Sequence, residues 1–184
     1  MTGDIVVIAL PAALVCAWAA WAVARALRIA RHLRGARVVT CPETGRPAVV
    51  AIDVRHAVAS GLDEQVAPLQ LRACSRWPER GGCNEPCICE AAAPASTPRA
   101  IVESALKGES CAFCRKPIED VAFLGHYPAL LQSDRTTIAW PDVPLERLRD
   151  SVRSQRPVCW NCHVTETFRR RYPELVTDRP WTRA

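Results

Sequence analysis

The 184-residue chain lacks the short motifs that mark common enzyme active sites. It contains no H-E-x-x-H metalloprotease motif, no G-x-S-x-G nucleophile turn, no P-loop and no dinucleotide-binding fingerprint. Its four histidines, His32, His56, His126 and His163, belong to none of these motifs. We therefore expect no catalytic residue and a protein that is not an enzyme.

A basic folded surface is also missing. The whole chain has a net charge of +5, but residues 1–37 contain five arginines and one acidic residue, which leaves only +1 for residues 38–184. A nucleic-acid-binding domain needs a basic face of its own. The sequence therefore predicts no nucleic-acid partner.

Aromatic residues are few, at 6% of the chain. A small unit with few large apolar side chains buries little surface on folding. A bound metal ion would supply folding free energy that such a core cannot. The cysteines are the residues that could bind such an ion.

One long apolar run lies near the N-terminus. Residues 5–24, IVVIALPAALVCAWAAWAVA, contain no charged residue and would span about 30 Å as a helix, enough to cross a bilayer. A cleaved signal peptide and a buried helix are the alternatives. The preceding MTGD has no Lys or Arg, which a signal peptide would need there. We therefore expect a single-pass anchor in the cytoplasmic membrane.

Five arginines follow this run with no acidic residue among them, namely Arg25, Arg28, Arg31, Arg34 and Arg37. Positive side chains beside a membrane span stay in the cytoplasm. The sequence thus predicts an outside N-terminus and a cytosolic C-terminal part. Side chains spaced by three residues progress around a helix instead of forming one stripe. We expect all five to contact lipid head groups of the bilayer.

The chain has ten cysteines, of which Cys16 lies in the apolar run. The other nine fall in the part predicted to be cytosolic, where disulfides are rare and clustered thiols indicate metal ligands. The strongest pattern is a set of two C-x-x-C pairs, Cys111 with Cys114 and Cys159 with Cys162. Two such pairs can complete a tetrahedron around one Zn²⁺. A pair in a turn and a pair at the start of a helix look like a zinc-ribbon or treble-clef finger.

The segment C-W-N-C-H also fits other chemistry. Cys159 and Cys162 could attach a c-type haem, with His163 as its axial ligand. Such a haem is attached outside the cytosolic membrane face and would leave the other C-x-x-C pair without a role. A redox-active C-x-x-C pair and an iron–sulfur cluster are further alternatives. Zinc is the prediction because it uses both pairs.

A second metal site could form from Cys41, Cys74, Cys83 and Cys87. The segment C-P-E-T-G resembles the C-P-x-C-G turn of zinc ribbons with Thr44 in place of the second cysteine, so it offers one ligand. Cys89 could replace Cys87 as the fourth ligand. Scattered reduced thiols and an iron–sulfur cluster are the alternatives here.

The remaining pattern predicts an α+β fold, with a transmembrane helix followed by small metal-stapled units of zinc-ribbon or treble-clef type. Strands are expected at residues 36–41, 46–54, 121–127 and 136–140. Helices are expected at residues 98–107, 144–154 and from about residue 163. The predicted organisation is an anchor and basic helix at 1–37, a cysteine-cluster unit at 38–93, a linker and short helix at 94–108, and a zinc domain at 109–184.

Several segments together resemble a group of small bacterial proteins that are membrane-anchored and rich in cysteine, namely TCPETGRPA, CSRWPERGGC, CAFCRKPI, HYPALL and VCWNCHVTETFRRRYPELVTDRP. The resemblance covers nearly the whole chain after the anchor. It implies that the cysteine pairs belong to one architecture, and it implies no activity or substrate.

Taken together, the sequence predicts a membrane-anchored, cytosol-facing zinc-binding module. It would be a non-enzymatic interaction or assembly factor with a membrane or cytosolic protein partner. The alternative is a membrane-bound electron-transfer protein that carries c-type haem or an iron–sulfur cluster.

Overall fold

The computed structural model describes residues 3–62, 69–79, 83–118, 121 and 125–175. The fold mixes helices with small sheets, as predicted, and the chain divides into two compact units. Unit 1 is Met1–Ser96 and unit 2 is Thr97–Ala184. The division falls inside the segment 94–108, which is predicted as a linker and short helix.

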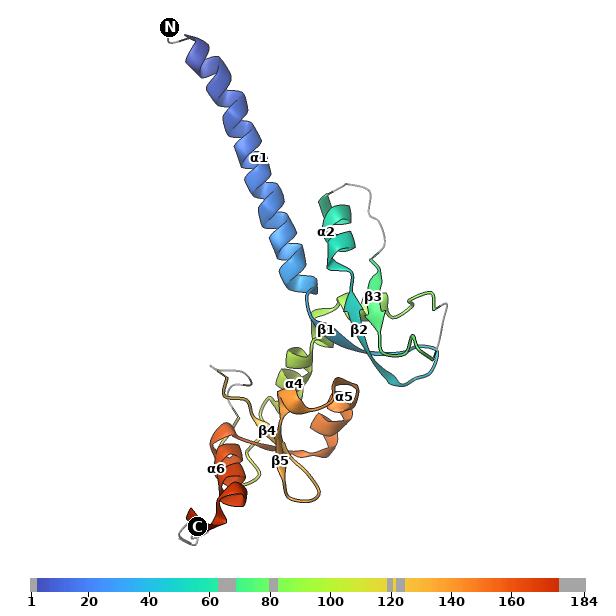
Figure 1. Ribbon diagram of the computed structural model, residues 1–184, viewed down its shortest axis with the longest axis vertical. Helices are drawn as coiled ribbons and strands as arrows, with labels where there is room; N and C mark the ends of the chain where they lie inside the picture. Colours follow the sequence, from blue (N-terminus) through green and yellow to red (C-terminus); the bar gives the residue numbers. More distant parts are fainter. Residues whose placement is uncertain (1–2, 63–68, 80–82, 119–120, 122–124, 176–184) are drawn as a thin grey trace. The chain divides into compact units, whose positions relative to one another are not determined.

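Helix α1, Gly3–Leu33, is the longest element of unit 1 (Figure 1). Its segment Ala12–Leu33 is long and apolar enough to cross a membrane, and its most apolar stretch is 0% buried. Leu14, Val15 and Trp18 each keep about two thirds of their surface exposed. The helix ends at Leu33, shortly before Gly35, whose φ of +98° suits a residue without a side chain.

The last turns of α1 pack against α2, Val54–Leu62, and the two helices lie side by side in Figure 1. Gly61 permits this approach, because a Cβ there would lie 2.6 Å from Cδ1 of Ile29. The Arg25 Nε also donates a hydrogen bond of 2.6 Å to the Gly61 carbonyl. Residues 25–33 therefore pack on the rest of unit 1, whereas Leu14, Val15 and Trp18 of the preceding turns stay exposed.

Three antiparallel strands form the sheet of unit 1, in the order β1-β2-β3. The hairpin of β1, Ala36–Thr40, and β2, Pro47–Ile52, confirms the prediction for this region, and β3, Leu71–Cys74, pairs with β2. Helix α3, Ile88–Ala92, packs on β1 and β2, and the short helix η1, Pro94–Ser96, follows it. The core consists of Leu33, Val39, Ala48, Val50, Ile52, Ala57, Leu71, Cys87 and Ala91.

Arg37 is buried in unit 1, so the expectation that it contacts lipid is wrong. Its side chain is 1% exposed, and its guanidinium donates to the carbonyls of His32 and Ala93. These bonds tie the end of α1 to the residues after α3, and burial lowers the pKa of Arg37. The four other arginines of the series are exposed.

Unit 2 begins with α4, Pro98–Leu106, at the predicted residue. The Thr97 hydroxyl accepts a hydrogen bond of 3.2 Å from the Ala100 N–H, and Pro98 takes the first helical position. Helix α4 packs against α5, Leu145–Ser154. The two helices bury Ile101, Val102, Leu106, Leu148 and Val152.

The sheet of unit 2 has the order β5-β4-β6, with both pairings antiparallel. Its strands are β4, Ala129–Leu131, β5, Thr137–Ala139, and β6, Arg156–Val158. The short helix η2, Trp140–Asp142, follows β5. Helix α6, Trp160–Arg171, follows β6 and ends before η3, Pro173–Leu175. The strand predicted at 121–127 falls partly outside the described residues.

We predict that Arg37→Ala loosens unit 1. Losing the guanidinium removes the donor to the His32 carbonyl and the link to Ala93, whose carbonyl still accepts from Ser96, and should lower the free energy of local opening by about 2–3 kcal/mol. Hydrogen exchange of peptides from β1 and β2 in the full-length protein measures this change. Arg34→Ala, at an exposed site nearby, should shift it by less than about 0.5 kcal/mol. Equal protection in both variants would contradict the role given to Arg37.

Candidate metal centre

The first cysteine pair of unit 2 lies in a tight turn. The Cys111 N–H donates to the Lys116 carbonyl at 2.9 Å, and the Arg115 N–H donates to the Cys111 carbonyl at 3.0 Å. Arg115 has a φ of +62°, which lets the chain reverse within these few residues. The Ala112 N–H donates to the Pro157 carbonyl at 2.8 Å and so fixes the turn to β6.

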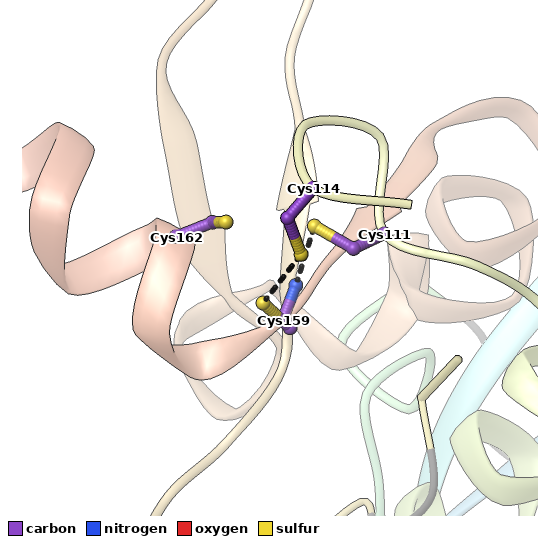
Figure 2. Close-up of side chains that lie close together, drawn as sticks. All are labelled: Cys111, Cys114, Cys159 and Cys162. Atoms are coloured by element: carbon purple, nitrogen blue, oxygen red, sulfur yellow. Dashed lines mark hydrogen bonds between the residues drawn. The ribbon is translucent and has the colours of Figure 1, made fainter. Parts of the chain in front are cut away.

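The second pair lies where β6 passes into α6. Cys159 is the residue that precedes the helix, and its carbonyl accepts the His163 N–H at 2.9 Å. Cys162 follows three residues later, on the same side of the first turn. Figure 2 shows the sulfurs of both pairs pointing toward one another, two from the turn and two from the start of α6.

The four sulfur atoms are arranged as one compact group. Those of Cys111, Cys114, Cys159 and Cys162 all lie within 4.8 Å of one another. The Cys114 and Cys159 sulfurs are 3.7 Å apart. Four sulfurs bound tetrahedrally to one Zn²⁺ at about 2.3 Å lie about 3.8 Å apart. The group can therefore hold a metal ion with little rearrangement.

The surroundings of Cys111 favour the thiolate form of its side chain. Its side chain is 0% exposed, and the Cys159 N–H lies 3.3 Å from its sulfur. Burial alone would raise the pKa of Cys111, but backbone N–H donors from Cys114, Cys159 and Phe113 lower it to about 7. Burial raises the pKa of Cys159 and, together with the neighbouring sulfurs, that of Cys162. A cation among these sulfurs would favour ionisation of all of them.

His163 is held by a neighbour outside the sulfur group. Its Nδ1 lies 2.8 Å from the Thr137 hydroxyl of β5, and burial lowers the pKa of the ring. The Trp160 ring lies 5.9 Å from that of His163 and stacks at 5.2 Å on that of His126. These contacts orient the first turn of α6 on the sheet.

The cysteines of unit 1 form a looser group. Cys41, Cys74, Cys83 and Cys87 line one cavity of about 20 Å³. Burial raises the pKa of Cys87, and the three other thiols add to that effect. Within the described ranges, only the unit 2 group brings its ligand atoms within 4.8 Å of one another. Cys89 is exposed.

Comparison of the chain with protein-family models, with curated proteins and with solved structures gave no match. The four-cysteine group of unit 2 is therefore the basis for a proposed function.

The C-x-x-C spacing identifies the four cysteines of unit 2, but no sequence motif identifies the groups that contact the Cys111 sulfur and the His163 ring. The donors to the Cys111 sulfur are backbone N–H groups, which leave no signature in residue identity. Thr137 lies 26 residues from His163 and belongs to no motif with it. Only the folded turn reveals these contacts.

We predict that Cys162→Ser removes about one metal ion per chain from the full-length protein, because three sulfurs no longer complete the tetrahedron. The free energy of unfolding of unit 2 should fall with it. Metal analysis and hydrogen exchange of α6 measure the two effects. Cys89→Ser and His163→Ala should leave the metal content unchanged. Loss of metal in His163→Ala with retention in Cys162→Ser would refute the ligand assignment.

Proposed function

We propose that this protein is a membrane-anchored, cytosol-facing zinc-binding module that acts as a non-enzymatic interaction or assembly factor. The observation that carries the proposal is the convergence of four thiols from two distant segments of unit 2. Zn²⁺ bound by four thiolates has no open coordination position, so it stabilises structure and does not activate water.

The spacing of the sulfurs supports a single ion. A [4Fe–4S] cluster places each thiolate on a different iron and therefore spreads the four sulfurs more widely than one ion does. A c-type haem would use Cys159 and Cys162 for thioether bonds and leave the other two thiols of the compact group without a function. One tetrahedral ion uses all four, and Zn²⁺ is the usual ion of such structural sites.

The local architecture supports a zinc-ribbon or treble-clef-like centre. A tight turn supplies Cys111 and Cys114, and the beginning of a helix supplies Cys159 and Cys162. In such a centre the ion joins a turn to a helix that lies far away in the sequence. The folded unit then offers a fixed surface to a protein partner in the membrane or the cytosol.

The properties of α1 support membrane anchoring. Its apolar segment leaves large side chains exposed in unit 1, and a bilayer would cover them. Arg25, Arg28, Arg31 and Arg34 are exposed at its C-terminal end and would favour the cytosolic side. We infer a single span with the N-terminus outside and both cysteine groups in the cytosol.

The orientation is tested with reporter fusions in a bacterial host. A C-terminal reporter that is active only in the periplasm should be silent, and one that is active only in the cytosol should give signal. Replacing the four exposed arginines with Gln should give a mixture of orientations, because the charge asymmetry is lost. Periplasmic activity of the unmodified chain would refute the orientation and favour the haem alternative.

A further inference from the structure

The cysteine cavity of unit 1 has the dimensions of a small ion site. Its volume of about 20 Å³ is close to the space that one water-sized sphere occupies. Four of its lining residues are cysteines, and others, such as Leu71, Trp77 and Pro86, are apolar. Thiols gathered around a small, largely apolar space are the environment that soft metal ions such as Zn²⁺ prefer.

The turn that carries Cys41 repeats the backbone pattern of the turn that carries Cys111. The Cys41 N–H donates to the Arg46 carbonyl at 2.9 Å, and the Gly45 N–H donates to the Cys41 carbonyl at 2.8 Å. Unit 2 has the same two bonds at the same spacing. The Cys111 N–H donates to the carbonyl five residues later, at Lys116, and the N–H four residues later, at Arg115, donates to the Cys111 carbonyl. Even the left-handed residue matches, with a φ of +63° at Gly45 and +62° at Arg115.

The position of the second ligand matches as well. Thr44 follows Cys41 by three residues, as Cys114 follows Cys111. The Thr44 N–H donates to the Cys41 carbonyl at 3.3 Å, and hydrogen bonding by the Thr44 side chain lowers the pKa of Cys41. The turn of unit 1 thus has the backbone form of the Cys111 turn, with a hydroxyl in place of the second thiol.

The other three thiols reach the cavity from segments that carboxylates hold in place. Cys74 ends β3, and Cys83 and Cys87 lie in the loop before α3. The Glu85 carboxylate of that loop accepts the Leu71 N–H at 2.8 Å and so joins the loop to the start of β3. The Glu90 carboxylate of α3 accepts the Thr40 N–H at 3.1 Å, beside Cys41. Three separate segments thereby meet at one cavity.

We propose that Cys41, Cys74, Cys83 and Cys87 bind a second Zn²⁺, in unit 1. The ion draws the four sulfurs inward from the cavity wall into a tetrahedron, with Cys74 or one cysteine of the 83–87 loop filling the corner that Thr44 leaves empty. Cys89 is not a ligand, because it is exposed and lies outside the cavity lining. All four ligands lie in unit 1, so metal binding here can be tested separately from metal binding by the unit 2 cysteines.

The test is the zinc content of the full-length protein, purified in detergent under reducing conditions from zinc-supplemented cells. The unmodified chain should contain two zinc ions, and Cys83→Ser should contain one. Cys162→Ser should also contain one, and the double variant none. Cys89→Ser is the matched control and should contain two. Equal zinc content in Cys83→Ser and in the unmodified chain would overturn the proposal, whether that content is one ion or two.

A rescue variant distinguishes the loss of a ligand in Cys83→Ser from misfolding of that variant. Adding Thr44→Cys to it completes the turn with a sulfur where Cys114 stands in unit 2, and the second zinc should return. Failure to regain it would refute the equivalence of the two turns. In the unmodified chain, chelation of zinc should also make the four unit 1 cysteines react faster with N-ethylmaleimide. Equal reactivity before and after chelation would likewise overturn the proposal.

Discussion

Four sulfur atoms meet at one end of α6, a helix with no fully buried side chain. Its half-buried Trp160 stacks on His126. His163 and Arg170 each make one hydrogen bond outside the helix, with the Thr137 hydroxyl and with the Arg135 carbonyl. These contacts together contribute only modestly to the position of α6. A structural zinc site contributes about 10–16 kcal/mol in small zinc-binding peptides, which matches the whole net stability of an ordinary domain. A metal ion in this group would thus decide whether α6 docks on its sheet.

The same type of backbone turn occurs in both units. A turn closed by two backbone hydrogen bonds and a left-handed residue presents a cysteine at residue 41 and again at residue 111. Each unit is small, and each gathers thiols from segments that lie far apart in sequence. Metal ligation can fix such segments where a core of few aromatic residues would not. In unit 1 the last turns of α1 add to the core, so one helix joins its apolar segment directly to the rest of the unit.

The features that sequence predicted are those with a strong local cause. The C-x-x-C spacing identified the sulfur group, the Thr97-Pro98 pair identified the start of α4, and the two apolar runs around residues 41–46 identified the hairpin. The features it missed depend on tertiary contacts. Strands β4 and β6 have three residues each, and their pairing with each other in the sheet defines them. Arg37 follows the spacing of the other arginines, and only the fold reveals that it is buried. The match between the backbone hydrogen bonds of the Cys41 and Cys111 turns likewise depends on the fold.

We propose above all that the unit 2 thiols bind one zinc ion as a closed, all-sulfur centre. X-ray absorption at the zinc edge of a full-length variant that lacks the unit 1 thiols tests this coordination. We expect four sulfur neighbours at about 2.3 Å and no nearby second metal. A shell of nitrogen or oxygen ligands at about 2.0–2.1 Å, or an absorbing centre made of iron with iron neighbours, would contradict it.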